Sequence, residues 1–262
     1  MSALRKFQQQ FAFDPQKAFL VGVEREAFVH DTHGVPTPRS ATVLQAIQDH
    51  LLAAYFSPEL SACQIESCTS PCQLPALAKE LKDRAEVLTS AAASQELRLC
   101  YQPVGPLDMP LDHFDDPAGR YREIVARLPV ETLRAGCRVA GTHVHVGLPD
   151  ADTALAVYNQ AVSQLAELIK LGCTDGGERI ALYQTMAPGW RSPQYHSWKH
   201  YHEVAKREGF ADNPRDCWHL IRLTIHGTIE FRMFDSCEDE ALIVRWAEQC
   251  LRLCEQAVSL VP

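Results

Sequence analysis

Polar side chains of complementary types recur two residues apart in four short apolar segments of this 262-residue chain. The pairs are Glu24 and Glu26, Gln64 and Glu66, His143 and His145, and Glu230 and Arg232. Residues i and i+2 of a β-strand point to the same side of a sheet, so each pair would share one face. Carboxylates with an occasional imidazole suit hard divalent cations such as Mg²⁺, and a nearby guanidinium suits phosphate. The four segments therefore predict a sheet face that binds divalent cations and phosphate.

The residues between these pairs are mostly apolar, which predicts that the opposite face of the sheet packs against a hydrophobic core. The expected strands are Phe19–Val29, Ala62–Cys68, Val139–Leu148 and Gly227–Phe234. Each pattern alone is weak, because a solvated strand often carries Glu-x-Glu and a cross-strand ion pair often explains Glu-Phe-Arg. A solvated face would also mix in Lys, Thr and Ser, so the joint occurrence carries the prediction. Gly141 and Gly147 flank the two histidines and would allow close approach of other groups.

Helical spacing of apolar residues predicts the elements that position these strands. The expected helices are Ser40–Tyr55, Leu74–Ala93, Arg120–Leu128, Asp150–Leu171, Ser197–Arg207, Pro214–Leu220 and Glu238–Leu260, and Leu99–Val104 is a further candidate strand. The last strand is expected to begin at Leu223. Residues 172–193 are long for a structureless connection, so they are predicted to be functional or partly helical. Helices and strands mix without strict alternation, which favours a single α+β domain over 1–262 with a largely antiparallel sheet.

Composition narrows the functional class. The net charge of −8 argues against nucleic-acid binding, and no apolar run approaches the ~20 residues of a membrane span. The first residues lack a signal-peptide pattern and the ten cysteines are scattered, so we expect a reduced cytoplasmic protein. Cys63, Cys68 and Cys72 lack the CxxC spacing of a structural zinc site. No Walker A, Rossmann or nucleophile-elbow motif is present in the sequence.

Further candidates lie outside the strands. Arg122 opens a predicted helix, where surface exposure and substrate binding are both consistent with its type. Arg191 lies in an irregular segment, and such segments over an open sheet often carry binding residues. His196 and His200 share a helix face, but the glutamate of a metalloprotease HExxH motif is missing.

Taken together, four motifs resemble those of the glutamate–cysteine ligase family, in particular its bacterial carboxylate–amine ligase branch. They are Gly22-Val-Glu-Arg-Glu26, Gln64-Ile-Glu66, Gly141-Thr-His-Val-His-Val-Gly147 and Gly227-Thr-Ile-Glu-Phe-Arg-Met-Phe-Asp235. The resemblance implies a fold like the glutamine synthetase catalytic domain, a curved and mostly antiparallel sheet that forms an open funnel with helices on its outer face. It also implies that ATP phosphorylates a carboxylate, often that of glutamate, and that an amine then displaces the phosphate to give an amide.

The same resemblance assigns roles to individual residues. Mg²⁺ (or Mn²⁺) is expected at Glu24, Glu26, Glu66, His143 and Glu230. The ATP phosphates are expected to contact Arg232, with His145, Arg191 and Arg122 as further candidates for nucleotide binding. Glu230, Arg232 and Arg191 are the candidate catalytic residues. The expected partners are a small carboxylate and an amine, without nucleic acid or membrane, and the protein is a candidate homo-oligomer.

Three alternatives stay open from the sequence. Family ligases usually continue well past the Glu-Phe-Arg strand, whereas this chain has one more helix, so a member without activity that still binds nucleotide is one alternative. A kinase of related fold would phosphorylate a guanidino or amine group with the same metals. A metal-dependent hydrolase is the weakest alternative, because no positioned nucleophile is evident.

Overall fold

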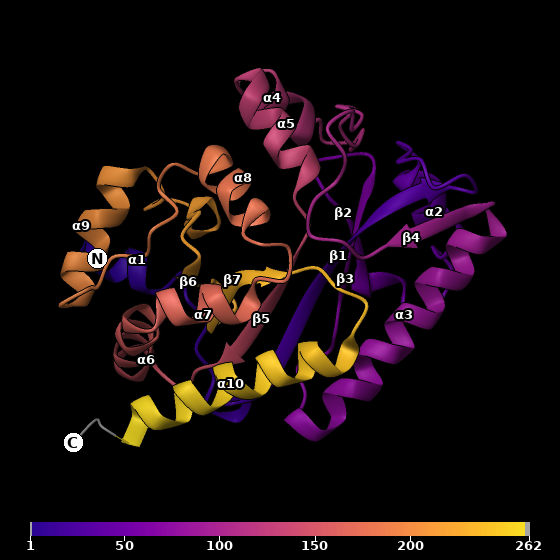
Figure 1. Cartoon of the computed structure of the whole chain (residues 1–262). Helices are drawn as coiled ribbons and strands as arrows, with labels where there is room; N and C mark the ends of the chain where they lie inside the picture. Colours follow the sequence, from indigo (N-terminus) through magenta and orange to yellow (C-terminus); the bar gives the residue numbers. More distant parts are fainter. Residues whose placement is uncertain (1, 260–262) are drawn as a thin grey trace.

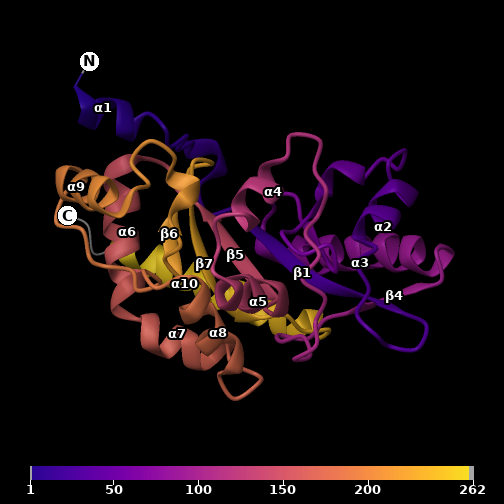
Figure 2. The same ribbon diagram turned by 90° about the horizontal axis from the view of Figure 1, so that it is seen from above.

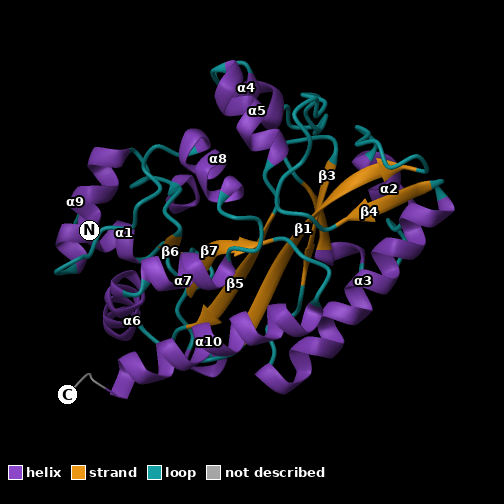
Figure 3. Ribbon diagram, in the orientation of Figure 1, coloured by secondary structure: helices purple, strands orange, loops and turns teal. Residues whose placement is uncertain are grey.

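An antiparallel sheet runs through the middle of the computed structural model, which describes residues 2–259 (Figure 1, Figure 3). Its strand order is β2-β3-β1-β5-β7-β6, and β4 pairs with β1 beside this path. The strands are β1 Val21–Asp31, β2 Phe56–Pro58, β3 Gln64–Cys68, β4 Leu97–Cys100, β5 Gly141–Gly147, β6 Ile221–Leu223 and β7 Thr228–Asp235. The prediction of an α+β fold with a mostly antiparallel sheet is confirmed.

Strand register brings the predicted pairs together on one face. Glu24 lies opposite His143, and Glu26 lies opposite Glu66. On the far side of β5, His145 lies opposite Glu230. Because side chains alternate along each strand, Val23 and its partner Val144 point to the other face and are buried there. The alternation seen in the sequence therefore separates a polar face from a core face.

Helices cover the core face and frame the polar one. They are α1 Ala3–Gln8, α2 Ser40–Ala46, α3 Leu77–Ser94, α4 Arg120–Val125, α5 Val130–Arg138, α6 Ala151–Ser163, α7 Leu165–Gly172, α8 Glu178–Met186, α9 Trp198–Glu208 and α10 Glu240–Ser259. Figure 1 and Figure 2 show α3 and α10 crossing one side of the sheet and α4 and α5 on the other. The main core joins the strands to α10 and includes Val144, Phe231 and Trp246, all fully buried.

The predicted strand from Leu223 to Phe234 is wrong in one respect, because the segment is a hairpin. Strand β6 ends at Leu223, and β7 begins at Thr228. The turn between them contains Gly227 at a φ of +74°, where a side chain would be strained. This hairpin adds Arg222 to the polar face, opposite Glu230.

Several predicted boundaries also differ. The Asp150–Leu171 helix divides into α6 and α7 because Gln164 leaves the helical backbone, with φ −102° and ψ 6°. The strand expected at Leu99–Val104 ends at Cys100 instead, since its length is set by pairing with β1. The helix expected over Ser40–Tyr55 stops at Ala46, and only Pro214–Asp216 of Pro214–Leu220 is helical, as a 3₁₀ turn (η4). The predicted end of the last helix, Leu260, lies outside the described residues.

The connection after α7, the cysteines and the helix lengths complete the description of the fold. Residues 172–193 contain α8, so the prediction of partial helix is confirmed. All ten cysteines are free thiols. Cys63, Cys68 and Cys72 do not form a group that could share a metal ion within the described part of the chain. Among residues 2–259, no helix has the length and apolar character needed to cross a bilayer.

Candidate active site

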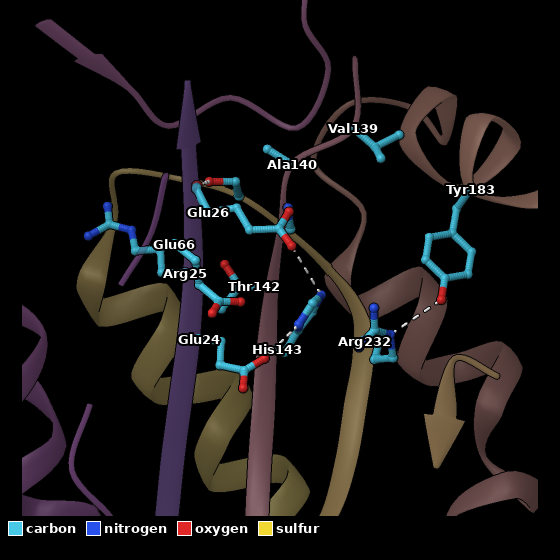
Figure 4. Close-up of polar contacts among 12 residues, drawn as sticks. Glu24, Arg25, Glu26, Glu66, Val139, Ala140, Thr142, His143, Tyr183 and Arg232 are labelled. Atoms are coloured by element: carbon cyan, nitrogen blue, oxygen red, sulfur yellow. Dashed lines mark hydrogen bonds and ion pairs between the residues drawn. The ribbon is translucent and has the colours of Figure 1, made fainter. Parts of the chain in front are cut away.

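His143, on β5, lies at the centre of the polar face (Figure 4). Its Nδ1 atom lies 3.0 Å from Oε2 of Glu24 and 3.6 Å from Oε1 of Glu230. Its Nε2 atom lies 3.6 Å from Oε1 of Glu26. His143 is only 4% exposed, and its imidazole stands between carboxylates from two sequence-distant strands, β1 and β7. Strand pairing therefore places groups from β1, β5 and β7 within contact distance of one another.

His145 lies two residues after His143 on β5 and adds a second imidazole to the same face of the sheet. Its Nε2 atom lies 3.3 Å from Oε1 of Glu24, and its Nδ1 atom lies 2.9 Å from the hydroxyl of Thr228. Burial lowers the pKa of His145, but the charges of Glu24 and Glu230 outweigh burial and raise that pKa above its usual value. The Glu24 pKa moves the other way. Burial raises it, but His145 and His143 bring it well below its usual range.

Glu230 is completely buried and is neutralised by two arginines. Nε of Arg222 donates to its Oε2 at 2.6 Å, and Nη1 of Arg232 donates to its Oε1. Burial alone would raise the pKa of Glu230, but Arg222 and Arg232 hold it far below its usual range. Arg232 also donates from Nε to the hydroxyl of Tyr183 at 3.3 Å, which fixes its orientation (Figure 4). This end of the site is thus rich in fixed positive charge.

The other end of the site, near β3, is rich in carboxylates. Glu59 precedes β3, and its pKa is raised to about 8 by burial and by the charges of Glu26 and Glu24. Burial and the charges of Glu24, Glu59 and Glu26 likewise raise the pKa of Glu66 well above its usual range. Ser57 donates to Glu66 at 3.0 Å. Without a bound cation, these carboxylates tend to retain protons.

The donor atoms fit divalent cations at three overlapping positions. Within each group the ligand atoms lie within 4.8 Å of one another: Glu24, His145 and Glu230; Glu24, Glu66 and His143; and Glu26, Glu59 and Glu66. Glu24 and Glu66 each belong to two groups, as carboxylates that bridge ions do. Oxygen donors with single imidazoles match Mg²⁺ or Mn²⁺ rather than a thiolate-bound metal.

A cavity of about 860 Å³ lies between α4 and the η4 turn, and no residue of the three ligand groups lines it. Arg120, Arg127 and Arg215 line it, together with Glu123 and Asp216. Two hydrogen bonds connect α4 and the η4 turn to residues next to the cluster. The hydroxyl of Tyr121, on α4, donates to the Pro58 carbonyl next to Glu59, and Arg222 donates to the Arg215 carbonyl at 3.0 Å. The three arginines make this cavity suitable for anionic groups.

Most residues expected at the site converge there. Glu24, Glu26, Glu66, His143, His145, Glu230 and Arg232 all lie on the polar face, in contact or within the same ligand groups. Arg122 and Arg191 are exposed, and neither has an ion pair with the cluster among residues 2–259. The Arg191 guanidinium instead lies 5.0 Å from the Trp190 ring. Gln64 has a structural role, since its amide donates to the Val139 carbonyl at 2.6 Å.

Two site residues were missed by the sequence analysis. Arg222 belongs to β6, which the expected single strand left out. The alternation of Ile221, Arg222 and Leu223 before Gly227 was an available signal for a hairpin. Glu59 follows Pro58 in an irregular segment, and no periodic pattern marks it.

The glycines around the two histidines have the role that the sequence predicts. A Cβ atom on Gly141 would lie 1.9 Å from Nη2 of Arg179, a buried side chain that also contacts the Ala140 and Arg232 carbonyls. A Cβ atom on Gly147 would lie 2.0 Å from the Lys17 carbonyl oxygen. Glycine is therefore required at both ends of β5, where Arg179 and the Lys17 backbone come close to the strand.

Comparison with known structures relates the fold to enzymes with similar sheets. The chain superposes on a bifunctional glutathione synthetase from Pasteurella multocida with a TM-score of 0.61, 16% identity, and coverage of 93% of this chain and 41% of that chain. A glutamine synthetase from Plasmodium falciparum gives a TM-score of 0.52, 11% identity, and coverage of 99% and 55%. At these identities the likeness concerns the fold alone.

Sequence comparison is more specific. A relative from Chloroflexus aggregans is 23% identical over 95% of this chain and 65% of its own length. A glutamate–cysteine ligase from Halobacterium salinarum is 25% identical over 87% of this chain and 67% of its own length. The chain thus spans about two thirds of the length of these relatives. The family model of glutamate–cysteine ligase family 2 matches residues 20–173, more than half of the 262 residues, so the chain belongs to that family.

Proposed function

We propose that this protein is an ATP-dependent carboxylate–amine ligase that requires divalent cations. The observation that carries the proposal is the convergence of Glu24, Glu66, His143 and Glu230 into groups whose ligand atoms lie within 4.8 Å of one another. Membership of glutamate–cysteine ligase family 2 supports the reaction class. A purely structural polar cluster would neutralise its own charges, whereas Glu59 and Glu66 have raised pKa values because they are buried and face other carboxylates.

Mg²⁺ or Mn²⁺ would be held by Glu24, Glu26, Glu66, His143 and Glu230, with Glu59 and His145 added from the geometry. Bound cations would supply the positive charge that offsets the ATP phosphates and the carboxylates around them. Glu24 and Glu66 each belong to two ligand groups, so each would contribute to more than one candidate cation position.

The reaction would proceed in two displacements. An oxygen of the substrate carboxylate attacks the γ-phosphorus of ATP, which forms an acyl phosphate and releases ADP. The nitrogen of an amine then attacks the acyl carbon, and phosphate leaves with a proton lost from the amine. Arg232 would stabilise charge on the transferred phosphoryl group, held in orientation by Tyr183 and Glu230. Arg191 and Arg122, both exposed, would contact the nucleotide only at the rim.

The substrates would bind in the 860 Å³ cavity between α4 and the η4 turn, whose elements are hydrogen-bonded to residues next to the cluster. Arg120, Arg127 and Arg215 would donate hydrogen bonds to the anionic groups of the acid substrate, of the amine substrate or of both. The name of the Halobacterium relative makes glutamate the first acid and cysteine the first amine to test.

A product assay tests the proposal. The full chain is incubated with ATP and Mg²⁺ or Mn²⁺ across a panel of carboxylic acids and amines, and phosphate release and condensed products are measured by mass spectrometry. The ligase predicts equal amounts of ADP, phosphate and amide. A phosphorylated amine without amide would indicate a kinase instead. ATP binding without turnover across the panel would contradict both.

A further inference from the structure

A second pocket, of about 450 Å³, lies on the core side of the sheet, away from the candidate active site. It is formed by α3, β4 and the connection into α10, which lie together on that side of the molecule (Figure 1). The floor is apolar and includes Ala85, Leu97 and Leu99. Its rim is charged, which distinguishes it from a packing gap in the core.

Two positive and two negative side chains line this back pocket: Arg25 and Arg98, and Glu238 and Glu240. Among the described residues, neither Arg98 nor Glu238 has an ion pair or a side-chain hydrogen bond. Nη1 of Arg25 lies 3.9 Å from Oε1 of Glu240, which is too far for a hydrogen bond. Charges of both signs thus face the pocket with few partners of their own.

Arg25 and Tyr101 form a rigid wall of the pocket. Arg25 is 3% exposed, and its Nε and Nη2 atoms donate to the Cys237 carbonyl at 3.1 and 2.6 Å. Its guanidinium lies 3.6 Å from the centre of the Tyr101 ring. The hydroxyl of Tyr101 is buried and has no hydrogen-bond partner. Because this hydroxyl has almost no accessible surface, the wall that Tyr101 offers to the pocket is its ring, packed against the Arg25 guanidinium.

We propose that the back pocket binds an aliphatic α-amino acid or short peptide that carries a free ammonium group and a free carboxylate. The carboxylate would pair with Arg98 and with the remaining donors of Arg25. The ammonium group would pair with Glu238 and Glu240. The aliphatic side chain would pack on Leu97, Leu99 and Ala85. A ligand with only one of the two charges would leave the opposite side chains unpartnered.

Binding at the back pocket would influence the metal cluster through β1. Arg25 lies between Glu24 and Glu26, and it points away from His143 while they face the cluster (Figure 4). The connection next to the pocket also holds this strand, because the Ser236 hydroxyl donates to the Glu26 carbonyl at 2.5 Å. Ligand and cation would therefore alter each other's affinity by the same factor.

Isothermal titration calorimetry on the full chain, without ATP or metal, tests the proposal with L-leucine and glycyl-L-leucine. N-acetyl-L-leucine lacks the ammonium group, and L-leucinamide lacks the carboxylate. The pocket variants are Arg98→Gln and Glu238→Gln. The matched controls are Lys82→Gln and Glu86→Gln, which change exposed charges on α3 outside the pocket. We expect each blocked ligand and each pocket variant to weaken binding about tenfold, and the controls to leave it unchanged.

Three results would overturn the proposal. The first is that neither L-leucine nor glycyl-L-leucine binds at concentrations up to 20-fold above ~1 mM, the range of weak metabolite sites. The second is that the blocked ligands bind as tightly as L-leucine. The third is that both pocket variants bind L-leucine as tightly as the wild type. Loss of binding in Glu66→Gln, with Arg98→Gln unaffected, would place the ligand in the active site instead. Since no turnover is measured, these results do not depend on whether the ligase assay succeeds. A Mn²⁺ titration with and without saturating L-leucine then measures the coupling, and equal Mn²⁺ affinities would refute it.

Discussion

The two ends of the candidate site surround their carboxylates with opposite charges. At the β6–β7 end, Glu230 is fully buried and is neutralised by Arg222 and Arg232. At the β3 end, Glu59 and Glu66 face other carboxylates, and both have raised pKa values. At the first end the protein itself supplies the charges that neutralise the carboxylate. The second end is electrostatically incomplete without protons or cations.

This difference indicates how the two ends divide the chemistry. Fixed guanidinium groups beside Glu230 suit a transferring phosphoryl group, whose negative charge they can share. Carboxylates that repel one another suit divalent cations, since binding an ion relieves the repulsion. His143, in contact with Glu24, Glu26 and Glu230, joins the two ends.

The largest effect is expected from Glu230→Gln. The substitution keeps the shape of the side chain but leaves two arginines without a carboxylate in a buried site. Breaking a buried pair in this way typically costs about 3–5 kcal/mol of unfolding free energy, which chemical denaturation of the metal-free protein can measure. Ligation should fall by at least ~10²-fold because Arg232 loses its partner. Glu248→Gln, on the surface of α10, is the matched control, and equal stability of the two variants would contradict this account.

Substitution at the carboxylate-rich end should have the opposite effect on the free energy of unfolding. Glu59→Gln and Glu66→Gln remove a charge that burial and the neighbouring carboxylates disfavour, so at pH 8 each variant should be more stable than the wild type without metal, by about 1–2 kcal/mol. Each should also bind Mn²⁺ at least ~10-fold more weakly, because a ligand oxygen is lost. Thermal unfolding with EDTA and with Mn²⁺ measures both effects. If the variants were less stable than the wild type in EDTA, the proposed difference between the two ends would be wrong.

The pH dependence of metal-free stability follows from the same carboxylates. The folded-state pKa of Glu59 is raised from 4.5 to about 8, so the folded protein binds this proton more tightly than the unfolded chain does. This stabilisation is complete below pH ~4.5 and is lost as the pH rises towards 8. The melting temperature with EDTA should therefore fall by roughly 5 °C between pH 5.5 and 8.5. Mn²⁺ should reverse the fall, and a double Glu59→Gln, Glu66→Gln variant should flatten it; a wild-type profile without slope would contradict the assignment.

How far the sequence predicted this site depended on periodicity. Glu24, Glu66, His143 and Glu230 could be predicted because they alternate with apolar residues on strands, and alternation identifies the face. Their pairing across strands could be inferred only through the family resemblance. Glu59 could not be predicted, since its position depends on an irregular turn before β3. Arg222 was missed because the expected strand began at Leu223, although the alternation of Ile221, Arg222 and Leu223 before Gly227 indicated a hairpin.

The smallest expected effect concerns Arg191, where sequence and structure give different weight to one residue. The sequence made it a catalytic candidate, but in the structure it is exposed beside Trp190 and has no ion pair with the cluster among the described residues. An exposed charge usually contributes ~1 kcal/mol or less, so Arg191→Gln should lower kcat/KM by less than ~5-fold. Arg232→Gln, in the same assay, should lower it by at least ~10²-fold. A loss of similar size in both variants would mean that the segment around Arg191 contacts the phosphates during turnover. The arginine-rich end would then include a segment outside β6 and β7, and this segment would have to move towards the cluster during turnover.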